Sequence, residues 1–354
     1  MFKTASFFRI ATDFVMPPLD AFEEALQATR FEPCGPTQPE SNGWVAPRGN
    51  KSISMLESIG GQIILKLCTE RRPLPASAVK AAVDELIEKY KEETGQERVG
   101  SKIKKEFKEQ VVFDLLPRAF TKRSTTLLWL DPVNHFLVVD TGSLSGADKV
   151  VTFLIEALSE VPGSLPGSLP GLGVKPVLTN MSAAASMSHW LSSREAPVGF
   201  TVDRDCELKT PDDQKSTVRY SRHTLEIDEV AEHIAAGKVP TQLALTWNDR
   251  ISFVLTETAQ VKKLKLLDVV LDGVQEGGKD DDGFDTDAAI LTGELSAMLP
   301  DLLEALGGEV GAATSDAEID AEQAPVKAVS GSPTATAASS AYVSLTGSAA
   351  DAPF

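Results

Sequence analysis

Two segments of the chain carry the pattern of a β-hairpin, and they constrain its fold more than any other feature. Residues 125–140 and 242–256 are each rich in apolar and β-branched side chains. Each run is interrupted near its middle by turn-forming residues, which are 131–134 in the first segment and Asn248 with Asp249 in the second. The two segments therefore predict two pairs of adjacent strands.

The two hairpin segments resemble one another in their surroundings. Each is preceded by a helical pattern and eventually followed by another, at 147–161 after the first and at 288–306 after the second. This order predicts a mixed α+β protein made of two related helix–hairpin–helix halves. The similarity is weak, so chance is a fair alternative explanation for it.

The N-terminal region predicts strands, one helix and a connecting loop. Residues 7–12 and 62–68 have the composition of strands, and the second of these is expected to be buried. Residues 19–28 have the apolar spacing of a short amphipathic helix. Residues 32–50 are rich in Pro, Gly and Asn and predict a loop.

Two further helices are predicted upstream of the first hairpin. In the first of them Ser77 is the expected N-cap, and apolar side chains recur at helical spacing as far as Tyr90. After two glycines, apolar side chains recur every four residues from Ile103 to Leu115. This second helix is expected to end before Pro117, because proline cannot continue a helix.

Composition divides the chain into four parts. Residues 1–161 are expected to form an N-terminal α+β half with a basic helical excursion at about 76–116. A Pro/Gly/Ser linker follows at 162–173, where Pro-Gly-Ser-Leu occurs twice, and then a C-terminal α+β half at 174–310. The acidic, Ala- and Ser-rich tail at 311–354 cannot bury enough apolar area to offset the entropy of chain ordering, so we expect it to be disordered.

The formal net charge of −17 is unevenly distributed along the chain. Residues 266–354 contain 17 acidic and two basic side chains. Residues 98–123 contain eight basic and three acidic ones. Because a local positive field can coexist with an acidic total, the net charge does not exclude a nucleic-acid partner.

The composition favours a cytoplasmic protein. The three cysteines, Cys34, Cys68 and Cys206, form no close pair in the sequence, which argues against a disulfide framework and a four-thiolate metal site. The sequence lacks an apolar run of about 18 residues, the length that a membrane-spanning helix needs. Its N-terminus lacks the small-residue cleavage site of a secretory signal.

A search for catalytic motifs gives no candidate site. The sequence lacks a phosphate-binding loop, a His-Glu-x-x-His motif and a nucleophile elbow. The four histidines do not have the spacing of metal ligands. The acidic loop around Asp280 lacks the closing glutamate of a calcium loop, so a solvated loop is the better interpretation. We therefore expect no enzymatic activity, no metal and no cofactor.

The main positive signal is a set of basic residues on and after the second upstream helix. The helical spacing gathers its lysines on the side away from Ile103 and Phe107. Such a stripe suits contacts with phosphates, which need charge and reach rather than base-edge geometry. The alternative is that these side chains are merely solvated. The basic residues are Lys102, Lys104, Lys105, Lys108, Arg118, Lys122 and Arg123.

A second basic cluster, Lys262, Lys263 and Lys265, follows the second hairpin, with Lys238 and Arg250 nearby in the sequence. Its lysines alternate with leucines as in a half-buried strand, which could be an edge strand protected from aggregation. Neither cluster is accompanied by a helix-turn-helix, a zinc finger or an RNA-binding aromatic motif. Any DNA binding is therefore expected to involve the backbone without base readout.

Several short blocks of sequence keep a characteristic order and approximate spacing over about residues 1–309. They are 31–35 (FEPCG), 43–45 (GWV), 115–120 (LLPRAF), 126–131 (TLLWLD), 236–239 (AGKV), 243–247 (LALTW) and 291–295 (LTGEL). In these blocks the chain resembles the bacterial recombination-associated RdgC family. The Pro-Gly-Ser-Leu repeat and the tail beyond residue 310 depart from the family pattern.

The resemblance implies a mixed α+β protomer of a ring-shaped homodimer, with a positively lined hole that is wide enough for double-stranded DNA. It also implies DNA binding with little sequence preference and restraint of the RecA recombinase through occupation of its DNA. By position, Arg118, Lys122 and the lysines at 102–108 become candidates for the lining of the hole. Phe120 becomes a candidate for the closing contact between subunits, and the alternative is that it is a buried core anchor.

A second hypothesis is a protein-interaction regulator that acts directly on RecA. It would inhibit even with the basic stripe neutralised, whereas a protein that occupies DNA would not. The first hypothesis places the protein in the cytoplasm, associated with the nucleoid. The acidic tail could compete with DNA for the positive surface as a tethered polyanion, or it could simply aid solubility.

Overall fold

The α+β class that the hairpins predict is confirmed by a computed structural model of the chain. The described residues contain eight α-helices and a large antiparallel sheet. The predicted tail, most of the predicted linker and the acidic loop around Asp280 lie outside the described residues. The structure describes residues 2–161, 172–211, 216–225, 228–271 and 283–310.

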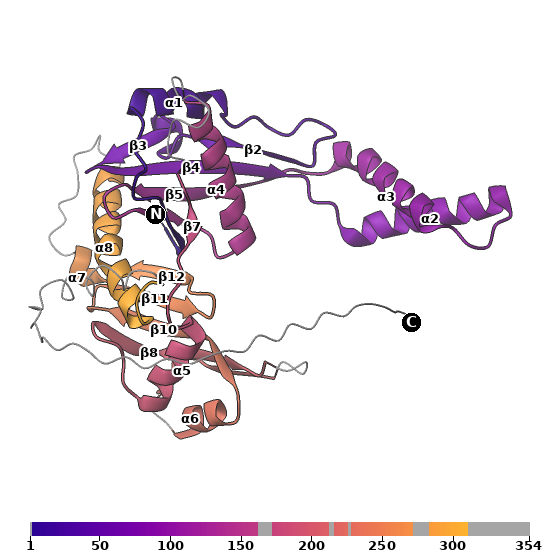
Figure 1. Cartoon of the computed structure of the whole chain (residues 1–354). Helices are drawn as coiled ribbons and strands as arrows, with labels where there is room; N and C mark the ends of the chain where they lie inside the picture. Colours follow the sequence, from indigo (N-terminus) through magenta and orange to yellow (C-terminus); the bar gives the residue numbers. More distant parts are fainter. Residues whose placement is uncertain (1, 162–171, 212–215, 226–227, 272–282, 311–354) are drawn as a thin grey trace, which may run out of the picture. The chain divides into compact units, whose positions relative to one another are not determined.

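The described strands form one sheet that runs through both halves of the sequence (Figure 1). They are β1 (Thr4–Arg9), β2 (Glu40–Val45), β3 (Leu56–Ile59), β4 (Gln62–Arg71), β5 (Lys122–Asp131), β6 (Phe136–Val139), β7 (Lys175–Pro176), β8 (Phe200–Lys209), β9 (Thr217–Tyr220), β10 (Val239–Trp247), β11 (Ile251–Thr256) and β12 (Val261–Leu266). The strand order is β2-β4-β5-β6-β1-β12-β11-β10-β8-β9, with β3 beside β4 and β7 beside β1. Strand β1 joins the two halves, because Ser6 pairs with Val139 of β6 and Thr4 pairs with Lys262 of β12.

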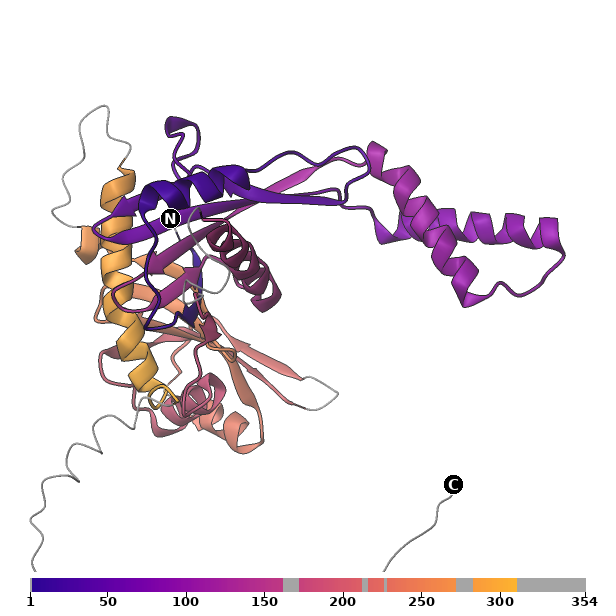
Figure 2. The same ribbon diagram turned by 45° about the horizontal axis from the view of Figure 1, so that its top comes forward.

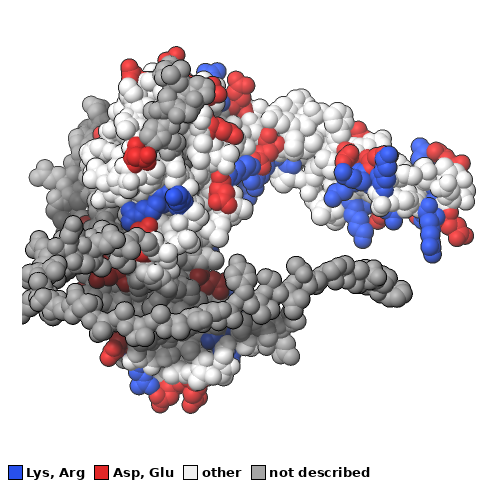
Figure 3. Space-filling model, viewed as in Figure 1, with Lys and Arg blue, Asp and Glu red and all other residues white. Residues whose placement is uncertain are grey.

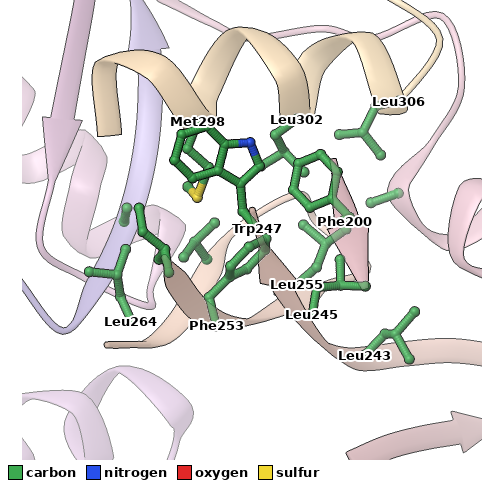
Figure 4. Close-up of a cluster of buried hydrophobic side chains, with 14 of the residues drawn as sticks. Phe200, Leu243, Leu245, Trp247, Phe253, Leu255, Leu264, Met298, Leu302 and Leu306 are labelled. Carbon is green, nitrogen blue, oxygen red and sulfur yellow. The ribbon is translucent and has the colours of Figure 1, made fainter. Parts of the chain in front are cut away.

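Two hydrophobic cores lie between the sheet and its helices. The helices are α1 (Leu19–Ala28), α2 (Ala76–Thr94), α3 (Ser101–Leu115), α4 (Leu144–Ser159), α5 (Ala183–Ser193), α6 (Asp228–Ala235), α7 (Asp268–Leu271) and α8 (Phe284–Ala305). The first core contains α5, α8 and strands of both halves, and Figure 4 shows Met298 and Leu302 of α8 beside Trp247 of β10. The second core contains α1, α4 and N-terminal strands. Together the two cores hold Met1–Val310 as one compact unit.

One face of the C-terminal strands lies opposite the first core, and we call it the open face; it carries polar side chains together with the buried Ala244 and Val254. Side chains alternate along a strand, so Ile251 and Phe253 enter the first core while Ser252 lies on the opposite face. Among the described residues, none from β8 to β12 belongs to the second core, so α1 and α4 cover only the N-terminal strands on this side. The open face includes Thr201, Gln242, Thr246, Ser252, Lys262 and Lys265.

Helices α2 and α3 form a two-helix arm inserted between β4 and β5 (Figures 1 and 2). No residue of α2 is buried and only Val111 of α3 is. The helices contact each other through rings such as Tyr90 and Phe107, which meet edge to face with centroids 5.8 Å apart. Gly95 ends α2 with a φ of 68°, a left-handed conformation that glycine adopts without steric cost. The two helices predicted here are confirmed, and α3 ends before Pro117 as expected.

The expected loop at 32–50 is corrected, because it contains strand β2 and a 3-10 turn, η1 (Gly49–Lys51). The β2 strand fits between β4 and the segment around Phe31. Gly43 permits this close approach, since a Cβ atom there would lie only 2.3 Å from the Phe31 Cα. The segment was predicted as a loop because it is rich in proline and glycine, yet it contains a strand whose Trp44 is fully buried.

Two smaller expectations are also corrected. Ser77 is not the N-cap of α2, because the helix already begins at Ala76 after Pro75, and no side chain caps it. The strand expected at 7–12 occupies Thr4–Arg9 instead. Its register is fixed by pairing with β6 and β12, which are distant in the sequence.

Candidate nucleic-acid interface

The predicted lysine stripe lies on α3. Lys102, Lys104, Lys105 and Lys108 are all exposed. Lys108 lies one turn before the buried Val111, on the same face of the helix, and lines an apolar groove with Val112 and Leu116. Lys105 lies 3.7 Å from Glu109, and both side chains are largely in water. The other three lysines form no ion pair with any described residue. Their ammonium groups are therefore available to an anionic partner.

The arm as a whole is not strongly positive. Helix α2 carries three lysines against five acidic residues, and Figure 3 shows both signs of charge over the arm. The positive character therefore belongs to α3 and to the residues that follow it. A 3-10 turn, η2 (Leu116–Arg118), leads from α3 towards β5, and both Arg118 and Lys122 are exposed there.

Arg123, at the start of β5, is held by groups from other elements. Its guanidinium forms an ion pair with Glu70 of β4 and lies over the Phe31 ring, 5.1 Å from the centroid. Glu70 is only 1% exposed. The hydrogen bonds from Arg123 and from the Cys34 N–H lower the pKa of this carboxyl. The charge of Arg123 is therefore largely neutralised by the buried Glu70 carboxylate, so Arg123 is a weaker candidate for binding an anionic ligand.

The second basic cluster lies on β12, which is a central strand, so the edge-strand alternative is wrong. It pairs with β11 on one side and with β1 on the other. Lys263 has a φ of 52° at a register shift, and this bulge lets both Val261 and Leu264 enter the first core. Lys262 and Lys265 consequently lie on the open face, where no described carboxylate pairs with them.

The two other predicted residues have structural partners. Arg250, beside the β10–β11 turn, binds Glu294 of α8 with two hydrogen bonds of 2.7 and 2.5 Å, which also raise the pKa of Arg250. Lys238 lies with its Nζ 3.2 Å from the His233 Nδ1. Neither residue therefore offers a wholly free charge.

Two basic residues outside the predicted set, Lys209 of β8 and Arg219 of β9, lie beside Glu207. Lys209 and Arg219 both pair with Glu207, and their hydrogen bonds lower the pKa of this carboxyl to about 2. Arg219 and Lys263 line a cavity of about 260 Å³. Side chains alternate between the two faces of a strand, so recognising β8 and β9 in the sequence would have placed Lys209 and Arg219 on the face of Glu207.

Phe120 is 93% exposed, so the alternative of a buried core anchor is wrong for the single chain. Phe113 of α3 is 59% exposed. A groove of about 580 Å³ lies between the arm and the end of β4, with apolar walls that include Leu74, Val79 and Leu116. Phe113 follows the groove residue Val112 in sequence, and Phe120 lies four residues after Leu116. Exposed aromatic rings and an apolar groove are each typical of a contact surface for another protein chain.

Within the described part of the chain, no group of three or more His, Cys, Asp or Glu side chains is arranged to hold a metal ion. The same residues include no helix that is long and apolar enough to cross a membrane.

Comparison with known proteins gives one consistent result. Residues 1–309 match a family model described as "Putative exonuclease, RdgC". A protein from Dechloromonas aromatica is 42% identical over 313 residues, which cover 87% of this chain and 98% of the relative. A protein from Herminiimonas arsenicoxydans is 41% identical over 309 residues, with the same shares of the two chains. Both carry the name "Recombination-associated protein RdgC".

Proposed function

This chain belongs to the RdgC family, and on that premise we propose that it is a recombination-associated protein that encircles double-stranded DNA as a homodimer. The observation that carries the proposal is the presence of unpaired lysines in two places, the exposed lysines of α3 in the arm and the half-buried Lys262 and exposed Lys265 of the open face. Neither surface belongs to a base-reading motif. Lysines without such a motif suit the phosphate backbone, which is the same in every sequence.

The proposed dimer is supported by exposed apolar groups where the arm joins the sheet, namely Phe120 and the groove lined by Leu74, Val79 and Leu116. A fully exposed phenylalanine costs solvation free energy in a monomer, and Phe120 is nearly so. Contact with a second copy of the chain would remove its ring from water. We propose Phe120 as an anchor of the contact that closes the ring.

Occupation of DNA gives a steric mechanism for restraining the RecA recombinase, because duplex inside the ring is less accessible to other proteins. The alternative is a direct interaction with RecA. The two differ in their response to loss of DNA binding: a variant without the α3 charges should no longer inhibit strand exchange if the mechanism is steric. Continued inhibition by such a variant would favour the direct interaction. The steric role would place the protein on the nucleoid.

We propose that the chain binds DNA without cleaving it, although the family description names an exonuclease. End-labelled duplex incubated with the protein and Mg²⁺ should remain intact. Release of labelled nucleotides, at a rate that increases with protein concentration and is absent in chelator, would contradict this part of the proposal.

Titration of a labelled duplex of arbitrary sequence across a salt series tests the proposal as a whole. Fluorescence anisotropy should report tight binding at low salt, with a log–log slope of about 0.9 for each neutralised phosphate. A second duplex of unrelated sequence should give the same affinity. Absence of binding at low salt would refute DNA binding, and a strong preference for one sequence would refute backbone recognition.

A further inference from the structure

Phe120 lies on a short connection whose two ends are both fixed. The connection runs from η2 to β5, and only Ala119, Phe120 and Thr121 lie between these elements. An exposed ring on a free loop would lose conformational entropy on binding, whereas a ring on a fixed loop loses less. The affinity of an aromatic anchor therefore depends on the groups that hold its loop.

Arg72 holds the first end of this connection. Its Nη1 donates to the Ala119 carbonyl oxygen at 2.9 Å and, more weakly, to that of Leu116 at 3.4 Å. Its Nη2 donates to the Cys34 carbonyl oxygen at 3.3 Å. The Arg72 backbone is fixed as well, since its N–H donates to the Pro39 carbonyl oxygen at 2.9 Å.

The role of Arg72 does not depend on an ion pair. No described carboxylate forms a salt bridge with it, unlike its neighbour Arg71, which pairs with Glu40 at 2.8 Å. The carbonyl groups at the end of a helix lack partners within the helix and carry partial negative charge. The Leu116 carbonyl oxygen already accepts the Ala119 N–H at 3.1 Å, so Arg72 is a second donor there. The shorter contact of Arg72 is with the carbonyl oxygen of Ala119, the residue between η2 and Phe120.

Arg123 holds the second end of the connection, and both arginines are linked to Cys34. Arg123 pairs with Glu70, and the Glu70 carboxylate also accepts the Cys34 N–H at 2.8 Å. Cys34 therefore donates its N–H to the Glu70 side chain and accepts at its carbonyl oxygen from Arg72. In this way the loop at 31–35 connects both ends of the Phe120 connection.

We propose that Arg72 is a positioning residue that holds the Ala119 carbonyl, and thereby presents Phe120 to a second copy of the chain. The inference rests on the proposed dimer and adds to it a residue that does not itself need to touch the partner. Arg123 supports the same loop from its other end.

The experiment measures the dimer dissociation constant of the full chain without DNA, by sedimentation equilibrium. The variants are Arg72→Gln, Phe120→Ala, the two combined, and Arg71→Gln, which removes the same charge one residue away. Arg72→Gln should raise the dissociation constant about tenfold, and Arg71→Gln less than twofold. In the Phe120→Ala background, Arg72→Gln should have less than a twofold effect, because a residue that acts through Phe120 loses its influence once the ring is gone.

Each other outcome overturns the inference in a distinguishable way. If Arg72→Gln changes the dimer dissociation constant equally in the wild-type and Phe120→Ala backgrounds, Arg72 supports the structure without acting through Phe120. An effect of Phe120→Ala without any effect of Arg72→Gln would refute the positioning role and leave the dimer intact. A wild-type chain that is monomeric at all concentrations would refute the proposed dimer itself. If Arg72→Gln fails to fold, Arg72→Lys, which keeps the charge but lacks the two Nη donors of the guanidinium, provides the same cycle.

Discussion

At the scale of single residues, carboxylate partners divide the basic side chains into two groups. Arg123 and Arg250 have acidic partners on other elements, whereas Lys104, Lys108 and Lys262 have none among the described residues. A basic side chain that already pairs with a carboxylate gains less electrostatic free energy from binding a phosphate, because the carboxylate offsets its charge. The unpaired lysines are therefore the better candidates for DNA contacts.

Glu207 makes stability depend on pH. Its pKa is about 2 in the folded chain, against an ordinary value of 4.5, so its contribution is complete above about pH 5 and is lost as the pH falls towards 2. Its partners Lys209 and Arg219 are partly exposed, which reduces the contribution by screening. Glu207→Gln should lower the free energy of unfolding by about 1–2 kcal/mol at neutral pH.

Urea unfolding of wild type and Glu207→Gln at several pH values measures this contribution. The difference between the two proteins should shrink as the pH falls from 5 to 3. Glu232→Gln on α6 is a matched control, because Glu232 is exposed and forms no ion pair with the described residues. A difference that stays constant over this pH range would mean that the Glu207 charge does not stabilise the fold.

The three thiols should be unreactive in the native protein. Cys34, Cys68 and Cys206 are buried, and burial raises the pKa of all three, that of Cys206 to about 12. The thiolate is the reactive form, so both access and ionisation are reduced. A colorimetric disulfide reagent at mildly alkaline pH should detect no rapidly reacting thiol in the native chain and three in denaturant. Rapid reaction of one thiol in native protein would show that its element opens locally.

At the scale of elements, the α3 stripe predicts a specific effect on DNA affinity. Lys102→Glu with Lys104→Glu should weaken binding to all sequences alike, by roughly tenfold or more at low salt, and should reduce the salt slope by about 0.9 for each lost phosphate contact. Lys89→Glu with Lys91→Glu, on α2 of the same arm, makes an equal change in net charge. Anisotropy titrations should give a much smaller effect for this control pair, and equal losses for the two pairs would mean that only total charge matters.

Elements with a strong local signal could be predicted from the sequence, and those fixed by distant partners could not. The turn residues Asn248 and Asp249 identified the β10–β11 hairpin, and apolar periodicity identified α3. The pairing of β1 with β12 has no local signal, because its registers join residues such as Thr4 and Lys262. The same holds for the candidate site. Apolar periodicity placed the lysines on one helix, α3, but the carboxylates that pair with Arg123 and Arg250 come from other elements.

At the scale of the whole molecule, the net charge of −17 gives a poor account of the surface that DNA would meet. Residues 266–354 contain 17 acidic and two basic side chains, whereas residues 1–265 are nearly balanced, with 34 acidic and 32 basic ones. The unpaired lysines lie on α3 and on the open face. A local positive field can coexist with an acidic total, so the unpaired lysines can attract DNA despite the net charge.

Encirclement makes a prediction that no binding surface on one side of the duplex would share. A closed ring on circular DNA cannot dissociate by sliding, whereas on linear DNA it can leave at an end. After binding at low salt and a challenge with high salt, which weakens phosphate contacts, complexes on closed circles should survive at least about tenfold longer than those on the same molecule cut once. Bulky protein blocks at both ends of the linear DNA should restore the long lifetime. Equal lifetimes on circular and linear DNA would mean that the protein binds the side of the duplex, and the dimer would then need another role.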